Sequence, residues 1–486
     1  MLPRNLKYGS KVEGAPAKST RINIQPQGPT TYGLGDNIII NIPTRRNLVL
    51  VPSESYLKFN FRYTNSSGAV EYYRWDSGGA HSVIQRLRCF HGSNLLEDID
   101  SYGMLAKMLM DLQVNTPSTT GKYNILAGTR ADILSRPTAV VVGNNGGNIV
   151  NGIAATSAGV TCTQLADVLN SVLTQPCATS NNGDFLGTVA DAGTSTVKTY
   201  CLNLVSMLGS LCQNQYIPLF AMDSAPLRLE IQLQDQLQKI LTCVGGTGTM
   251  IIDNVEYVAN FIELSDEAVN MIVESQQGEP LQFVLPSWRN YQFTSGVVAN
   301  TSINMPIPAK FSSLKSLFVC QRDRNATVRY APHSSITSGL SSYQFRLGSN
   351  IIPAKAPSTT AEYFAECLKA IGSMCDIYHS PSIDFASYST LQTTQEAAQA
   401  GNALYPYTIV SGINQSGSFY IGLDLENYAN APKDSIFAGY NSNTDDIYAV
   451  LNYGGTVTAS ANLRLDAYAL FDQVLVFANS TAFVRF

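Results

Sequence analysis

Charged side chains are scarce in this chain of 486 residues, because Asp, Glu, Lys and Arg together make up only 14% of it. An average globular protein has roughly 25%. The formal net charge is −5, which argues against the protein as a whole being a nucleic-acid binder. A surface with few charges suits a protein that buries much of its outside against neighbours. Gly, Asn, Ser, Thr and Tyr take the place of the charges, and this composition favours strands and turns over helices.

Motifs for metal binding and nucleophilic catalysis are missing as well. The chain has four histidines, and none stands in an H-E-x-x-H pattern or beside a cysteine pair, which disfavours a zinc site. His379 follows Cys375 and Asp376 closely, but a loop histidine beside a buried cysteine is a better interpretation than a nucleophile pair. There is no G-x-S-x-G elbow, and the glycine-rich stretch Gly245–Thr249 lacks the G-K-[ST] of a phosphate loop, so it predicts a hairpin turn.

Acidic residues do not form a site either. Glu97, Asp98 and Asp100 precede a predicted helix and are interpreted as capping charges, with a dispersed calcium site as the less favoured alternative. The sequence therefore predicts a protein that is not an enzyme, with no catalytic residue, no cofactor and no metal.

Signals for secretion and membrane insertion are absent from the sequence. The nine cysteines form no C-x-x-C pair, and their odd number and scatter predict mostly reduced thiols. The first residues lack the apolar run of a signal peptide, and no stretch of eighteen apolar residues occurs. We therefore expect a protein that is made inside a cell and is not secreted by a signal peptide.

What the sequence does contain is a long internal repeat. Gly92-Ser93-Asn94 ends a strand-like run and precedes an amphipathic helix at 101–113, and Gly348-Ser349-Asn350 is followed by a helix whose start has a capping box, Thr359 with Glu362. The pattern Ser-x-Leu-Lys-x-x-Phe occurs at 55–61 and again at 312–318. The distance in sequence between these two copies is almost the same as that between the two Gly-Ser-Asn motifs. A third pair of similar segments, 225–230 and 461–466, is separated by fewer residues than the other two pairs. These echoes predict two copies of one domain, with about twenty extra residues in the first.

Alternating strands with long loops predict the architecture of each copy. Runs such as Leu227–Leu233 alternate apolar and polar residues, and no β-helix-β rhythm occurs. The sequence predicts an all-β chain of two tandem eight-stranded antiparallel jelly rolls with short helices and long insertions. The predicted segments are an N-terminal arm at 1–36, a first jelly roll at 37–273 with a surface insertion at 137–200, a linker at 274–285, and a second jelly roll at 286–486 with a loop excursion at 378–417.

The predicted arm is basic. Its positive residues are Arg4, Lys7, Lys11, Lys18 and Arg21. Two interpretations remain open here, a solvated tail and a tail that touches a partner chain or nucleic acid.

Together, the repeat, the Gly-Ser-Asn turn before a helix, the strand Leu227–Leu233 and the closing stretch Tyr468–Leu475 resemble a double jelly-roll major capsid protein. The type is that of polinton-like viruses and virophages, within the lineage of adenovirus-type and giant-virus capsomers. A strand such as 254–258 running into an acidic helix at 265–268 is another shared feature. The resemblance extends from about residue 37 to 486.

The resemblance implies a mechanical function in the virion of a double-stranded DNA virus. Three chains would form a pseudo-hexagonal homotrimeric capsomer, and capsomers would assemble into an icosahedral capsid with minor capsid and penton proteins. The insertions 137–200 and 378–417 would form outer towers. The arm would contact neighbouring capsomers, an internal membrane or packaged DNA.

Other functions are weighed against this one. A carbohydrate-binding or adhesin β-sandwich protein is the main alternative, supported by the 25 tyrosines but lacking a secretion signal. A cupin-type metal enzyme would need clustered histidine and carboxylate ligands. A spike or minor capsid protein would not explain the duplicated domain.

Overall fold

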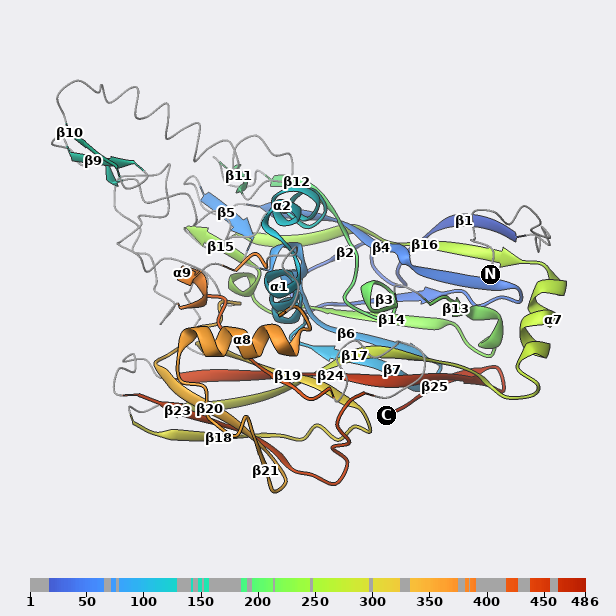
Figure 1. Ribbon diagram of the computed structural model, residues 1–486. Coiled ribbons are helices and arrows are strands. Elements are labelled where there is room, and N and C mark those ends of the chain that lie inside the picture. Colours follow the sequence, from blue (N-terminus) through green and yellow to red (C-terminus); the bar gives the residue numbers. More distant parts are fainter. Residues whose placement is uncertain are drawn as a thin grey trace, which may run out of the picture.

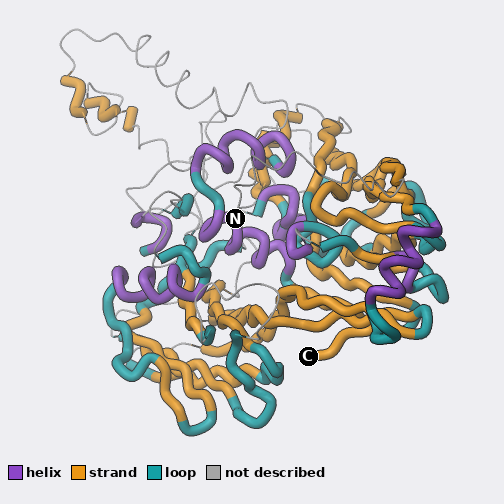
Figure 2. Tube along the Cα trace, turned by 45° about the vertical axis from the view of Figure 1, so that its right-hand side comes forward, coloured by secondary structure: helices purple, strands orange, loops and turns teal. Residues whose placement is uncertain are grey.

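The computed structural model describes residues 17–64, 71–75, 78–128, 141–142, 147–150, 153–156, 185–189, 195–212, 215–244, 248–296, 300–323, 333–374, 381–383, 385–389, 417–426, 438–454 and 462–486. These residues form two strand-rich lobes that lie side by side (Figures 1 and 2). Antiparallel sheets dominate both lobes.

Two sheets make up the first lobe. The first has the order β1 (Ala17–Ile24), β16 (Thr249–Leu264), β4 (Leu48–Thr64) and β12 (Ser195–Leu202). In addition, β2 (Thr31–Tyr32) pairs with β16, and β13 (Ile217–Pro218) pairs with β4. The second has the order β3 (Asn37–Ile42), β14 (Leu227–Leu233), β6 (Ile84–His91) and β7 (Asn94–Asp100).

The second lobe repeats this arrangement. Its first sheet has the order β17 (Leu281–Gly296), β24 (Asn462–Ala478), β19 (Leu314–Asp323) and β22 (Tyr420–Asp424), with β25 (Thr481–Arg485) paired to β24. Its second sheet has the order β18 (Ser302–Ile307), β23 (Ile447–Tyr453), β20 (Leu340–Leu347) and β21 (Asn350–Ile352). In both lobes the first principal strand pairs with the last, and the second with the one before the last, which is the winding of a jelly roll. The prediction of two tandem eight-stranded jelly rolls is confirmed.

Smaller elements connect these sheets. Within the described residues, the α-helices are α1 (Tyr102–Gln113), α2 (Thr116–Ser118), α3 (Asn124–Ala127), α7 (Asp266–Ser275), α8 (Thr360–Ala370) and α9 (Phe385–Tyr388). Two short sheets consist of β5 (Glu71–Trp75), β11 (Phe185–Val189) and β15 (Leu241–Val244), and of β8 (Val141–Val142), β9 (Gly147–Val150) and β10 (Ile153–Thr156). The helices predicted after the two Gly-Ser-Asn turns are α1 and α8, and the capping box of Thr359 and Glu362 is present in α8.

The Gly-Ser-Asn repeat is the same hairpin in both lobes. Gly92 joins β6 to β7 with φ 59°, and Gly348 joins β20 to β21 with φ 56°. A glycine with positive φ at the first position of a two-residue loop is the requirement of a type II′ hairpin, whose twist matches the flanking strands. The repeated motif therefore records a repeated turn.

The third sequence echo is not a structural repeat. Residues 227–233 form β14, the last strand but one of the first jelly roll, whereas residues 462–466 begin β24, the last strand of the second. The counterpart of β14 is β23. The alternation of apolar and polar residues is common to many strands, so this match reflected strand periodicity rather than descent.

Several predicted boundaries differ from the structure. The first jelly roll begins with β1, inside the segment predicted as an arm, because all eight residues of β1 pair with β16. The predicted linker at 274–285 is shorter, since α7 ends at Ser275 and β17 starts at Leu281. After Leu202, the last residue of β12, the chain turns and forms a short 3-10 helix at 210–212. Most of the insertions at 137–200 and 378–417 lies outside the described residues.

Candidate functional site at the seam between the jelly rolls

The two jelly rolls meet along a packed internal seam. Strand β7 of the first lies alongside β17 and β25 of the second, as the close course of these strands in Figure 1 illustrates. One hydrophobic cluster contains the core of the first jelly roll and, continuous with it, residues of the second such as Trp288, Phe318 and Tyr468. The interior of the second jelly roll is a separate cluster. The seam is therefore packed as a protein core rather than as a contact between independent domains.

Helix α1 lies within this seam. Every residue from Tyr102 to Leu112 is buried, so the helix is covered all round and not on one face only. The Sγ of Cys320, in β19 of the second jelly roll, lies 3.9 Å from the Sδ of Met108. A helix that belongs to the first jelly roll by sequence is thus packed against a sheet of the second.

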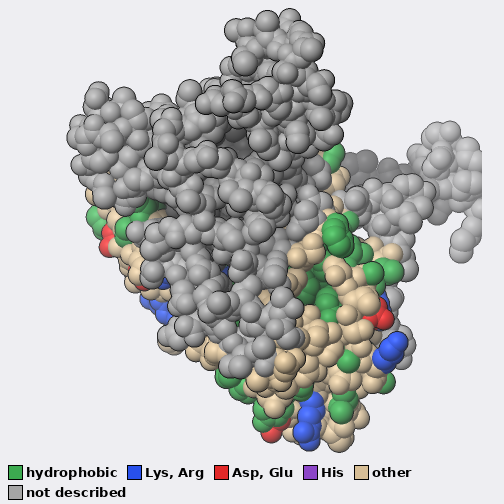
Figure 3. Space-filling view, turned by 90° about the vertical axis from the view of Figure 1, so that its left-hand side faces the viewer, with side chains coloured by type: hydrophobic (Ala, Val, Ile, Leu, Met, Phe, Trp, Pro, Cys, Tyr) green, Lys and Arg blue, Asp and Glu red, His purple; other side chains and the backbone are tan. Residues whose placement is uncertain are grey.

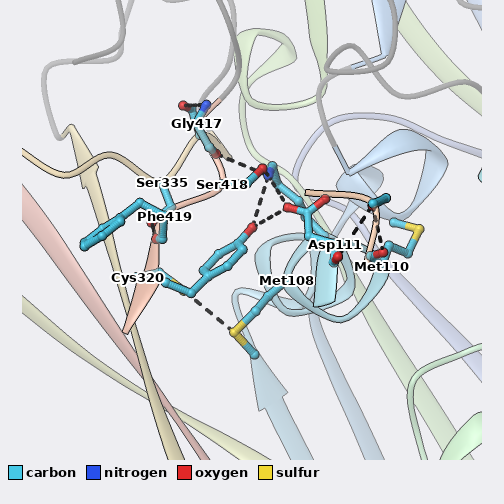
Figure 4. Close-up of polar contacts among 12 residues, drawn as sticks. Met108, Met110, Asp111, Cys320, Ser335, Gly417, Ser418 and Phe419 are labelled. Carbon is cyan, nitrogen blue, oxygen red and sulfur yellow. Dashed lines mark hydrogen bonds and ion pairs between the residues drawn. The ribbon is translucent and has the colours of Figure 1, made fainter. Parts of the chain in front are cut away.

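An ion pair is enclosed in this packing. The Nζ of Lys107 lies 2.6 Å from the Oδ2 of Asp111, with side chains 0% and 2% exposed. The ammonium also donates to the hydroxyl of Tyr420 at 3.0 Å, to the Oγ of Ser418 at 2.9 Å and to the carbonyl of Gly417 at 3.2 Å (Figure 4). The Tyr420 hydroxyl donates in turn to the Oδ2 of Asp111 at 2.6 Å. Both charges are therefore satisfied by groups from the two jelly rolls, as buried charges must be.

A second polar contact holds the start of α1. Ser101 has φ 48°, a left-handed conformation that is costly for a residue with a side chain. Its carbonyl accepts from the hydroxyl of Tyr468 at 3.0 Å, and its Oγ accepts from the Nη2 of Arg464 at 2.6 Å and from the Nε2 of Gln292 at 3.2 Å. Three residues of the second jelly roll thus fix one strained residue of the first.

Arg464 is itself positioned by a buried carboxylate. Asp466 accepts from the Nε of Arg322 at 2.7 Å and from the Nε of Arg464 at 3.2 Å. Burial alone would raise the pKa of Asp466, but the two guanidinium groups outweigh burial and hold its pKa below the ordinary value. Asp466 therefore stays ionised and holds Arg464 toward Ser101.

The acids interpreted as helix caps have other roles. Helix α1 has no side-chain cap, and Glu97 and Asp98 lie in β7. Asp98 forms an ion pair of 2.7 Å with Arg86. Glu97 is buried and accepts from the Oγ of Ser206 and, at 3.1 Å, from the backbone N–H of Met207. Burial raises the pKa of Glu97 to about 7, against hydrogen bonds that lower it, one of them from Ser287 of β17.

His91 and Asn94 connect the repeated hairpin to β25. The backbone N–H of Ala482 donates to the Nδ1 of His91 at 3.1 Å, so Nδ1 is unprotonated and Nε2 carries the hydrogen. That Nε2 lies 3.2 Å from the carbonyl of Met222 and 3.1 Å from that of Ala225. The Nδ2 of Asn94 donates to the carbonyl of Ala482 at 3.0 Å. Sequence reasoning noticed this motif as a repeat but missed its contact with the other jelly roll.

Chemistry-bearing residues outside the seam do not converge. Within the described ranges, no group of three or more His, Cys, Asp or Glu side chains could hold a metal ion, and no helix is long and apolar enough to cross a membrane. Cys89, Cys212, Cys320 and Cys367 are buried free thiols. His379, Cys375 and Asp376 lie outside the described residues, as do Arg4, Lys7 and Lys11 of the predicted arm.

Comparison with solved structures identifies the fold. The structure titled Faustovirus major capsid protein matches 98% of this chain and 93% of its own, with a TM-score of 0.56 and 11% identity. The chain has a double jelly-roll fold. The PBCV-1 virus capsid matches 99% of both chains with a TM-score of 0.54, and the mavirus major capsid protein matches 100% of this chain and 95% of its own with a TM-score of 0.51, each at 11% identity. No protein-family model and no curated protein matches the sequence. The double jelly roll thus persists where sequence similarity is nearly lost.

Proposed function

We propose that this chain is a major capsid protein, which assembles as pseudo-hexagonal homotrimeric capsomers into the icosahedral shell of a double-stranded DNA virus. The observation that supports it most is the pair of jelly rolls with equal topology, joined by a buried seam and similar to viral capsid chains over nearly the whole length. Two equivalent domains per chain give three chains six similar corners, which lets a trimer fill a hexagonal position. No enzymatic role is part of this proposal.

The seam supports this function physically. A shell subunit transmits load from one neighbour to the next, so its two domains must not move against each other. A continuous hydrophobic core with enclosed ion pairs has close packing and low compressibility. The chain is therefore suited to act as one rigid block with two similar corners.

The placement of the long insertions supports an outer and an inner end. The described parts of the two insertions, including β9, β10 and α9, lie at the end of the molecule opposite α7 (Figure 1). We propose that this end forms the outer towers. The described surface around it is mostly uncharged, with charged side chains scattered singly (Figure 3), as expected of a protein with little charge overall.

The proposed partners are other copies of the chain, neighbouring capsomers, minor capsid or penton proteins and, through the arm, an internal membrane or packaged DNA. Two of the five basic residues proposed for the arm lie in β1. The Nη2 of Arg21 donates to the hydroxyl of Tyr56 at 2.5 Å, and Lys18 stands opposite Glu263 in the ladder. Any contact with nucleic acid or lipid would therefore depend mainly on Arg4, Lys7 and Lys11.

Light scattering on the purified chain, with negative-stain images of the same fraction, tests the proposal. We expect one species near three times 52.6 kDa with a hexagonal outline. A species that keeps the mass of a single chain at every concentration, and that forms no shells in cells, would contradict it and favour the carbohydrate-binding alternative. A glycan-binding screen would then be the next experiment.

A further inference from the structure

Helix α7 carries an exposed apolar surface at the end of the molecule where the chain passes from one jelly roll to the other (Figure 1). Only Ala268 and Val269 are buried, whereas Met271 is 65% exposed, Val273 53% and Ile272 36%. Isolated helices shorter than about 12 residues are marginal in water, and three consecutive exposed apolar side chains are unfavourable on a free surface. The second half of α7 therefore needs a partner.

The same surface is acidic. Glu267, Met271 and Glu274 are spaced four and three residues apart, so they lie on one face of the helix. Asp266 accepts from the Nδ2 of Asn47, but Glu267 and Glu274 form no ion pair with any residue in the described ranges. Helix α7 itself has no Lys, Arg or His, and Arg46, which precedes β4, lies 3.9 Å from Asp266 but forms no ion pair with Glu267 or Glu274. A partner that fits this surface is both apolar and basic.

The N-terminal sequence has this composition and starts from the right place. Ala17, the first residue of β1, pairs with Leu264, which directly precedes the N-cap Ser265 of α7. Because β1 is antiparallel to β16, the chain enters β1 from the side on which β16 passes into α7. Residues 1–16 contain three basic residues and one acid, together with five large apolar ones: Arg4, Lys7, Lys11 and Glu13, and Met1, Leu2, Leu6, Tyr8 and Val12.

We propose that residues 1–16 dock on the exposed face of α7 of the same chain, with basic side chains toward Glu267 and Glu274 and apolar side chains over Met271. Sixteen extended residues span up to about 50 Å, and a ten-residue helix is about 15 Å long, so the segment is long enough to cover the whole helix. The connection through β1 gives it a high effective concentration at this surface. The inference concerns one chain and does not depend on the capsid function, although DNA or a membrane would compete for the same basic residues.

Site-specific photo-crosslinking of the full chain tests this docking. A benzoylphenylalanine replaces Met271, and peptide mapping locates the cross-links in an equal mixture of light and heavy isotope-labelled chains. We expect cross-links to residues 1–16 that join peptides of the same label. A matched control places the photoreactive group at Phe385, which is 76% exposed on α9, and is expected to give no cross-link to residues 1–16.

Charge reversal then tests the chemistry of the contact. With the crosslinker at 271, E267K together with E274K is expected to lower the yield ~fivefold, as the loss of two exposed ion pairs predicts. Adding K7E and K11E is expected to restore the yield. Cross-links only to other segments, a yield unaffected by charge reversal, or links that join light with heavy chains would each overturn the proposal, the last by assigning the site to a neighbouring copy. Tryptic cleavage after Lys7 is an independent readout, expected to be slow in the natural chain and faster in E267K/E274K.

Discussion

Equivalent sheets of the two jelly rolls differ in the polarity of their outer faces. In the first, β4 alternates buried Leu57, Phe59 and Phe61 with Lys58 and Arg62, and its outer face carries ion pairs to β16 such as Arg62–Asp253 at 2.9 Å. In the second, β19 is apolar on both faces: Leu317 and Val319 face the interior, whereas Phe318 and Cys320 belong to the seam cluster. Two sheets of equal topology thus differ in the chemistry of their outer faces, one polar and the other apolar.

An irregularity in the pairing of β19 explains why it differs from β4. The repeated pattern Ser-x-Leu-Lys-x-x-Phe aligns Phe61 with Phe318, yet Phe61 faces the core of its own jelly roll and Phe318 faces the seam. The register of β19 shifts between Leu314 and Ser316. A shift of one residue moves every later side chain to the opposite face. The same motif therefore serves two environments.

The largest expected effect comes from breaking the enclosed ion pair of the seam. Lys107→Met removes the ammonium that lies 2.6 Å from the buried Asp111 carboxylate, so we expect a loss of about 3–5 kcal/mol in the free energy of unfolding. Urea denaturation measures it. The matched control is Lys239→Met, whose pair with Asp235 has the same i,i+4 spacing at 2.7 Å but is exposed, and where the expected loss is below about 0.5 kcal/mol. Equal losses in the two variants would show that burial of the seam pair is not important.

The next effect is a pH dependence of the seam through Glu97. Burial raises the pKa of Glu97 to about 7 from its ordinary 4.5, so the folded chain holds this proton more tightly than the unfolded chain. Its contribution is fully present below pH 4.5 and is lost as the pH rises toward 7, by on the order of 2–3 kcal/mol. Comparing the natural chain with Glu97→Gln at pH 5 and pH 8 isolates this contribution. We expect the natural chain to lose more stability between these pH values, and an identical pH dependence would contradict this.

A smaller effect on stability is expected where α8 packs on β22, in the sheet of β17, β24, β19 and β22. A Cβ added at Gly422 of β22 would lie 2.9 Å from the Cα of Cys367, and backbone cannot move away as a flexible side chain can. Gly422→Ala is therefore expected to cost about 1–3 kcal/mol. Gly121→Ala is the control, since its Cβ would meet nothing within 4 Å. Thermal unfolding of the two variants gives the comparison, and equal midpoints would show that α8 yields at little cost.

The features that the sequence could predict are those encoded by neighbouring residues. The type II′ turns at Gly92 and Gly348, the capping box of α8 and the alternation of β14 are local, so their signals lie within a few neighbouring residues. The seam is not local, because Lys107 donates a hydrogen bond to Tyr420, more than three hundred positions away in the sequence. No sequence pattern near Lys107 predicts this partner. Strand β1 was missed because its residues are mostly exposed and its pairing with β16 depends on a distant strand. Tertiary pairing, rather than periodicity, created these features.

The smallest expected effect lies on the polar sheet of the first jelly roll. Arg62 and Asp253 are 40% and 17% exposed, so water screens their attraction, and Arg62→Met should change the free energy of unfolding by no more than about 1 kcal/mol. The variant is measured twice, by denaturation of the chain and by the mass distribution in light scattering over a range of concentrations. A small effect in both assays fits a face that stays in solvent. If unfolding is unchanged but the assembled species dissociates at higher concentration than before, this face is buried between chains. The contrast between the two sheets would then hold only for the isolated chain, since both outer faces would be covered in the assembly, one within the chain and one between chains.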